Sequence, residues 1–250
     1  DALRSFNNDG FSTIMNSGNE MVSWTWRKAP NFFDCVTYTG NGLPEGQGQT
    51  IPHGLSQEPG FIIVKSYTNQ SAWRCYHRGL FSAGDVADKY MLLNETEGVN
   101  TTGGAASWNN TFPTSTEFTA GSSINGSGVE YVAYLFGHDD TDEGLIKCGS
   151  FKTPADGTTR AVVELGWEPQ WVLTKSSSTS DDWQIIDSMR GITGNQADPA
   201  LSANNPNAEA NNANAVLTST GFEILRSGNQ DFIFMAIRRP NKPAEEFEPE

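Results

Sequence analysis

Short apolar runs separated by Gly, Asn, Ser and Thr follow one another along the chain. The run Phe61–Val64 (FIIV) is apolar on both faces, which is typical of a strand in the middle of a sandwich. Aromatic and polar residues alternate shortly afterwards at Trp73–His77, and Asn-Gly at positions 41–42 suits a tight turn. No long helical pattern competes with these signals, so we expect short strands joined by turns.

The longest recurring pattern is Leu55–Lys65 (LSQEPGFIIVK), which returns as Leu165–Lys175 (LGWEPQWVLTK). All matched positions are 110 residues apart, and the same spacing joins Trp73 to Trp183. Each Glu-Pro pair is expected to form a turn into a central strand, and the final lysine of each stretch to mark where that strand emerges into solvent. The chain therefore contains at least two copies of one unit.

Two units of this length can each bury a core of their own. We predict an all-β fold of tandem antiparallel β-sandwiches of jelly-roll-like kind. The predicted parts are a closing hairpin at 1–30, a first unit at 34–137, an acidic linker at 138–144, a second unit at 145–239 and an acidic tail at 240–250.

The chain has three similar endings but only two beginnings. Phe11, Phe118 and Phe222 each precede a polar turn and then an apolar strand, at 21–26, 131–136 and 232–237. The first ending thus lacks a unit of its own, and an isolated hairpin is marginally stable in water. Three explanations stay open: a piece of a longer polypeptide, which we favour; a hairpin donated to a neighbouring subunit; and a circularly permuted domain.

The net charge of -14 and the pI near 4.5 disfavour nucleic acids and anionic membranes as partners. No apolar run approaches the roughly 20 residues that cross a bilayer, so we expect neither a nucleic-acid partner nor membrane insertion. Three cysteines do not make a disulfide framework. Cys35 and Cys148 occupy matching places in the two units, and Cys75 is expected to be a small core residue.

Catalytic and metal chemistry find little support. His53, His77 and His138 lie far apart in sequence, and the second unit has no histidine. A nucleophile elbow, a phosphate loop and paired cleft carboxylates are missing, so a glycan depolymerase is the weakest hypothesis. Linker carboxylates could collect a calcium ion, but we expect them to be solvated; they are Asp139, Asp140, Asp142 and Glu143. We expect no catalytic residue, no cofactor and no metal.

One cluster could grip a sugar with flat aromatics and a cation: Trp73, Tyr76, His77 and Arg78. Since Trp73 repeats as Trp183 while its neighbours change, we interpret the tryptophan as a core residue. Arg78 is then expected to bond backbone carbonyls at the end of a strand.

Several motifs of the first unit resemble a known family. They are TGNG at 39–42, IPHGL at 51–55, EPGFIIVK at 58–65, WRCYHR at 73–78, WNNTFPTSTEFT at 108–119 and YVAYLF at 131–136. This combination resembles a tandem repeat domain of unknown function from tail-fibre and other virion structural proteins of marine tailed bacteriophages. The second unit keeps EPQWVLTK and Trp183 but not the YHR and WNNT motifs.

The resemblance implies a virion structural protein, in a tail fibre, an appendage or a surface decoration, without a defined active site. Its expected partners are other virion subunits, in a homo-oligomer, and a host surface glycan. Two polar loops, 95–110 and 203–215, are expected to touch the host. Their candidate contact residues are Asn100, Thr101, Asn109, Asn110, Asn204, Asn207 and Asn211. The alternative is an extracellular carbohydrate-binding module or adhesin.

Overall fold

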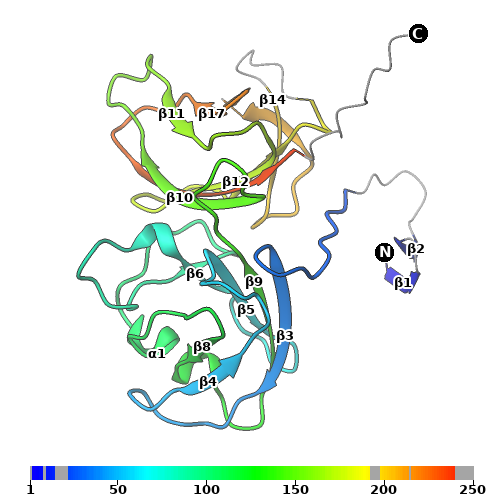
Figure 1. Cartoon of the computed structure of the whole chain (residues 1–250), viewed down its shortest axis with the longest axis vertical. Helices are drawn as coiled ribbons and strands as arrows, with labels where there is room; N and C mark the ends of the chain where they lie inside the picture. Colours follow the sequence, from blue (N-terminus) through cyan, green and yellow to red (C-terminus); the bar gives the residue numbers. More distant parts are fainter. Residues whose placement is uncertain (1, 8–9, 15–21, 192–197, 214, 240–250) are drawn as a thin grey trace.

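The computed structural model describes residues 2–7, 10–14, 22–191, 198–213 and 215–239. Antiparallel sheets make up this part of the chain, and its α-helix α1 (Ala105–Trp108) is a single turn. Figure 1 shows two β units stacked along the long axis. The predicted all-β, sandwich-type fold is confirmed. The acidic tail predicted at 240–250 lies outside the described residues.

The first unit combines a five-stranded sheet, in the order β3-β9-β5-β6-β7, with the pair β4-β8. Its elements are β3 (Phe33–Thr39), β4 (Gln49–Pro52), β5 (Phe61–Ser66), β6 (Arg74–His77), β7 (Met91–Leu92), β8 (Glu117–Ala120), β9 (Glu130–Phe136) and the 3-10 turns η1 (Arg78–Leu80) and η2 (Ser122–Ile124). Strand β5 pairs with β9 on one side and β6 on the other. It is the central strand that the sequence predicted.

The second unit repeats this plan with a six-stranded sheet, β10-β18-β12-β13-β14-β15, and a three-stranded one, β11-β17-β16. Its strands are β10 (Ile146–Lys152), β11 (Ala161–Glu164), β12 (Pro169–Ser176), β13 (Gln184–Asp187), β14 (Asp198–Ser202), β15 (Ala210–Ala213), β16 (Ala215–Thr218), β17 (Gly221–Ile224) and β18 (Asp231–Arg238). Strand β12 pairs with β18 and β13, as β5 does with β9 and β6.

The large sheet of each unit is buried on both faces. In β5, Ile62 and Val64 face the core of the first unit, whereas Phe61 and Ile63 face the second unit. The apolar layer between the units, called the shared layer below, contains Phe33, Phe61, Ile63, Cys75, Met91, Phe136, Ile146, Cys148, Trp171, Leu173, Trp183, Ile185, Ile233 and Met235. The doubly apolar pattern of the central strand therefore reflects burial between two cores rather than one.

Polar contacts cross the shared layer as well. The Trp183 indole N–H donates to the Leu92 carbonyl over 3.0 Å. At Gly79 the two backbones lie so close that a Cβ atom would stand 2.6 Å from the Gly149 carbonyl oxygen. Glycine is required there by the close approach of the second unit.

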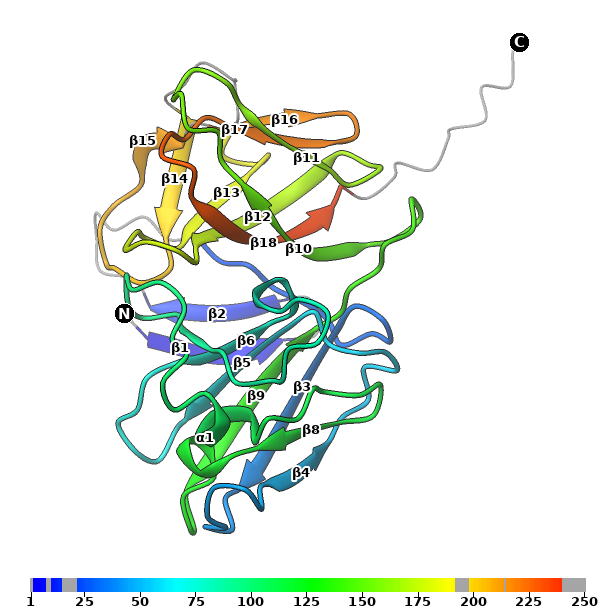
Figure 2. The same cartoon turned by 90° about the vertical axis from the view of Figure 1, so that its left-hand side faces the viewer.

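The N-terminal segment forms a hairpin, but not between the strands that the sequence predicted. Within the described residues, β1 (Ala2–Asn7) and β2 (Gly10–Ile14) pair only with each other. Figures 1 and 2 place this hairpin to one side of the units, near the level of the shared layer. The strand predicted at 21–26 is wrong, because residues 22–26 form no ladder. The strands that correspond to 21–26 in the two complete units are β9 and β18, and they already occupy this position in the two large sheets.

One further expectation is corrected and one is confirmed. Lys175 does not emerge into solvent, because its side chain is fully buried and its ammonium donates to the Ser176 carbonyl over 2.6 Å. Burial lowers the pKa of Lys175 to about 8. Its counterpart Lys65 is half-buried and binds the Ser66 carbonyl over 2.5 Å. The cysteine prediction is confirmed: Cys75 is fully buried in the shared layer and forms no disulfide.

The two polar loops are also less free than expected. Residues 95–110 contain α1, and the buried Trp108 donates its indole N–H to the Lys89 carbonyl. The same segment bonds to the second unit, since the Val99 N–H donates to the Ser177 carbonyl over 2.8 Å. Residues 203–215 include β15, at the edge of the six-stranded sheet. Backbone hydrogen bonding, which composition does not reveal, orders both stretches.

Candidate functional site

The segment formed by residues 22–27 lies against the shared layer. The ring of Trp26 meets Phe136 edge-on at 5.4 Å and Trp171 edge-on at 5.9 Å, and it is tilted against Phe33 at 6.1 Å. Phe33 and Phe136 belong to the first unit and Trp171 to the second. One tryptophan therefore contacts both units, in geometries that aromatic pairs favour.

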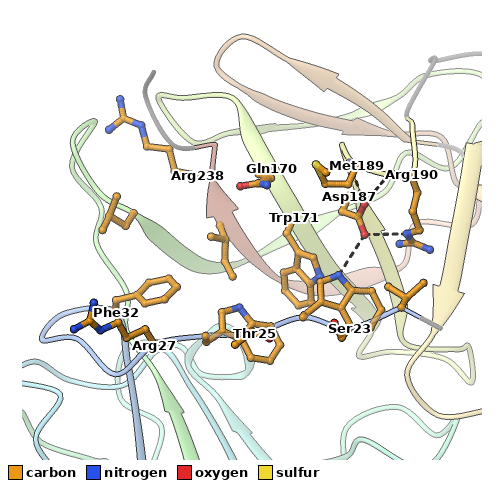
Figure 3. A pocket seen from close by; sticks show the side chains of 15 residues that line it. Ser23, Thr25, Arg27, Phe32, Gln170, Trp171, Asp187, Met189, Arg190 and Arg238 are labelled. Carbon is orange, nitrogen blue, oxygen red and sulfur yellow. Dashed lines mark hydrogen bonds and ion pairs between the residues drawn. The ribbon is translucent and has the colours of Figure 1, made fainter. Parts of the chain in front are cut away.

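Trp24 is held by a buried ion pair of the second unit, formed by Asp187 and Arg190, which Figure 3 labels. Its indole N–H donates to Asp187 Oδ2 over 3.3 Å, and Arg190 Nε donates to the same oxygen over 2.8 Å. The Arg190 guanidinium also lies 5.8 Å from the Trp24 ring centroid. Asp187 Oδ1 accepts the backbone N–H groups of residues 189 and 190. The carboxylate is thus fully used in ordering a turn and fixing the N-terminal segment.

A groove of about 570 Å³ runs along this contact, between residues 22–27 and the second unit. Seven large hydrophobic side chains are exposed in the described part of the chain, and three of them line this groove: Val22, Leu145 and Met189. Its floor includes Trp171, and its rim carries Arg238. Such an apolar groove with a charged rim is typical of a protein contact surface. We call it the N-terminal groove.

The equivalent position in the first unit is His77, which is 110 residues before Asp187. Its Nδ1 accepts the Gly79 N–H over 3.0 Å, so Nε2 carries the proton and donates to the Phe234 carbonyl of the second unit over 3.0 Å. Burial lowers the pKa of His77 to about 3, which keeps the ring neutral. His77 therefore fixes the second unit, and the equivalent Asp187 fixes the N-terminal segment.

The proposed sugar-gripping cluster is divided by the fold. Trp73 packs against the shared layer and His77 reaches across it. Tyr76 and Arg78 instead line a separate hollow on the first unit. Arg78 lies 3.7 Å from Asp140 of the linker in an ion pair, so the expectation that it bonds backbone carbonyls is not met. The interpretation of tryptophan as a core residue is confirmed at Trp183, which is buried in the shared layer.

Three of the seven candidate contact residues have structural roles. Asn204 accepts the backbone N–H of Trp183 through Oδ1 over 2.8 Å, and Asn94 accepts the backbone N–H of Trp73 in the same way. The spacing of 110 between Asn94 and Asn204 was the signal that could have revealed this. Asn109 Oδ1 accepts the Gly46 N–H, and Asn100 bonds to Tyr90 through its backbone in both directions.

The other four candidate residues are exposed: Thr101, Asn110, Asn207 and Asn211. Thr101 and Asn110 flank α1 in the first unit. Asn207 and Asn211 lie before and within β15 in the second. These four residues are free to contact a surface, but the structure does not bring them into one cleft.

Asp140, Asp142 and Glu143 of the acidic linker are exposed to solvent, as expected, and two of them also form ion pairs. Asp140 lies 2.8 Å from His138 Nε2 and 3.8 Å from the Lys147 ammonium. Glu143 lies 3.7 Å from the Arg238 guanidinium. Over the ranges that the structure describes, no group of three or more His, Cys, Asp or Glu side chains is arranged to hold a metal ion. Nor does a helix in those ranges have the length and apolarity to cross a membrane.

Comparison with known proteins gives one match. A family model described as a domain of unknown function (DUF7483) matches residues 1–239, so a single match covers the N-terminal segment and both units. No curated protein and no solved structure matches this chain.

Proposed function

Since this chain belongs to the DUF7483 family, we propose from its own features that it is a structural protein of a tailed-bacteriophage particle. It is carried on the outside of the virion in a tail fibre, an appendage or a surface decoration. Its partners are other virion subunits, including copies of itself, and its exposed side contacts the host surface.

The observation that carries this proposal is the way in which the two units and the N-terminal segment are fixed to one another. A continuous apolar layer joins the large sheets, and His77 and Asp187 anchor their neighbours from equivalent positions. Breaking these contacts would expose apolar area at a cost of roughly 25 cal/mol per Å². A body joined in this way suits mechanical display better than a hinge or a catalytic cleft.

The N-terminal groove is the assembly contact in this proposal. Leu145 is 57% exposed and Met189 is 82% exposed, side by side with half-buried aromatic rings. Exposed hydrophobic side chains gathered in one groove favour a protein partner over open solvent. Contact with the host falls to Thr101, Asn110, Asn207 and Asn211, which are exposed and make no contribution to the shared layer.

Assembly is tested with particles that carry altered copies of the chain. The double variant Leu145→Asp with Met189→Asp places charges in the groove and is expected to fold but to be missing from purified particles, as measured by mass spectrometry. Val162→Asp is the matched control, because Val162 is also 57% exposed but does not line the groove. The proposal fails if wild-type particles lack the chain, and its groove assignment fails if both variants are incorporated equally.

A further inference from the structure

The first unit carries a hollow of about 540 Å³ that the assembly groove does not include. It is lined by Gln57, Glu58, Pro59, Tyr76, Arg78, Phe81, Phe112, Pro113 and His138. These residues come from the segment before β5, the end of β6, η1 and the residue after it, the segment after α1, and the linker. We call it the Tyr76 hollow.

Aromatic rings form one wall of this hollow. Tyr76 stacks on Phe81 with ring centroids 5.4 Å apart, and Phe81 meets Phe112 edge-on at 5.1 Å. Phe112 is one of the exposed hydrophobic side chains, so part of its ring faces solvent. The Tyr76 side chain lines the hollow and is almost fully buried. A tyrosine hydroxyl can both donate and accept a hydrogen bond, so it adds a polar group to this otherwise apolar wall.

Charged groups form the other wall, and comparison with the second unit shows what is special about them. There, Glu168 pairs with Arg239 over 2.9 Å. In the first unit Glu58 takes the place of Glu168, at the spacing of 110. Phe61 pairs with Phe136 as the equivalent Trp171 pairs with Ile237, so two residues further on His138 takes the place of Arg239. His138 turns to Asp140, so Glu58 forms no ion pair within the described part of the chain.

The second unit also lacks the remaining groups of the hollow. At the same spacing of 110, Tyr76 corresponds to Ile186 and Arg78 to Ser188. An unpaired carboxylate, a guanidinium and a hydroxyl therefore converge beside an exposed aromatic ring in the first unit only. One copy of the repeat has acquired the donors and acceptors that the other copy lacks.

We propose that the Tyr76 hollow binds one hexose or N-acetylhexosamine residue of a surface glycan. The Glu58 carboxylate accepts from two ring hydroxyls, Arg78 donates to a hydroxyl or amide oxygen, and the apolar face of the sugar packs on Phe112. A sugar presents both donors and acceptors around a flat apolar face, which matches this set of groups. An anionic ligand fits less well, because Glu58 would repel it. The inference adds a glycan-binding site to the host contact proposed above and rests on that proposal.

Saturation-transfer NMR on the purified full chain tests the site directly. The probes are the methyl glycosides of glucose, galactose and mannose and of N-acetylglucosamine and N-acetylgalactosamine. We expect at least one of them to bind with a dissociation constant of about 1 mM. Glu58→Gln and Phe112→Ala should each weaken that binding at least tenfold, and Tyr76→Phe should weaken it less.

The repeat supplies the control. Glu168→Gln changes the equivalent carboxylate of the second unit and should leave sugar binding unchanged, with circular dichroism confirming that every variant folds. Absence of saturation transfer from all five glycosides at about 10 mM overturns the sugar site, and so does binding that persists in Glu58→Gln and Phe112→Ala. A chain that is present in particles but binds no glycoside refutes this inference alone, whereas a chain that binds a glycoside but is absent from particles refutes the virion proposal.

Discussion

Replacing His77 by Gln tests whether the contact between the units depends on a neutral buried histidine. In the native chain the ring donates to the Phe234 carbonyl and accepts from Gly79. Glutamine keeps an N–H donor near Phe234 but cannot gain a proton. The variant therefore removes the titration of residue 77 while preserving part of its hydrogen bonding.

The magnitude follows from the pKa of His77, which is about 3 in the folded chain against an ordinary value of 6.5. Below pH 6.5 the unfolded chain takes up a proton that the folded chain refuses. The free energy of unfolding therefore falls as the pH decreases from 6.5 towards 3, by up to about 1.4 kcal/mol per pH unit. The stability linked to His77 is fully present above pH 6.5 and is on the order of 4 kcal/mol.

The assay is urea unfolding followed by circular dichroism, at a series of pH values from about 4 to about 7.5. Carboxylates with lowered pKa, such as those of Asp34 and Asp156, also lose stability in acid, but they do so equally in both proteins. His77→Gln should be less stable than wild type at pH 7 and should approach it as the pH falls. His53→Gln is the comparison variant, because burial also lowers the pKa of His53 but the side chain is half-buried and lies outside the shared layer, so its replacement should change the pH dependence less. A stability difference for His77→Gln that stays constant between pH 4 and 6.5 would refute the reasoning.

Two further predictions use equivalent residues of the two units as matched pairs. Trp183→Ala removes a buried ring and its hydrogen bond to Leu92, and should lower the free energy of unfolding by about 3–5 kcal/mol. Trp73→Ala removes a half-buried ring and should lower the free energy of unfolding by less than about 2 kcal/mol in the same urea titration. Equal losses in the two variants would contradict the burial of Trp183 in the shared layer. Lys175→Met should raise the free energy of unfolding at pH 7 by about 1–3 kcal/mol, because burial lowers the pKa of the ammonium to about 8. Lys65→Met should change the free energy of unfolding by less than about 0.5 kcal/mol. A lower free energy of unfolding in Lys175→Met would contradict the argument that burying this ammonium is costly.

The repeat at a spacing of 110 predicted much of the fold because strand patterns are local. Phe61–Val64 was correctly placed at the centre of a large sheet. Glu168-Pro169 does not form the predicted turn, because the bend lies at residues 166–167 and Pro169 is the first residue of β12. The same spacing also related Asn94 to Asn204, although composition suggested a receptor loop for the latter. Reading every polar residue of the repeat in this way would have identified Asn204 as a backbone anchor.

The N-terminal groove and the Tyr76 hollow were harder to predict from sequence. Each one combines residues that lie far apart in the chain, such as Trp24 with Asp187 and Glu58 with Phe112. Neither set has a characteristic spacing, since the residues meet only after the strands have paired. The structure also separated Trp73 and His77 from Tyr76 and Arg78, because the shared layer and the hollow lie at different places on the first unit.

The sequence by itself determined that this protein is all-β, that its unit is written twice, and that β5 and β12 are central strands. These properties depend on the alternation of side chains along single strands, which the sequence states directly. Only the tertiary structure decided that the two large sheets share one apolar layer, that Lys175 is buried, and that His77 and Asp187 anchor different neighbours from equivalent positions. Those outcomes depend on which apolar face meets which, and a strand that is apolar on both faces does not specify its partners.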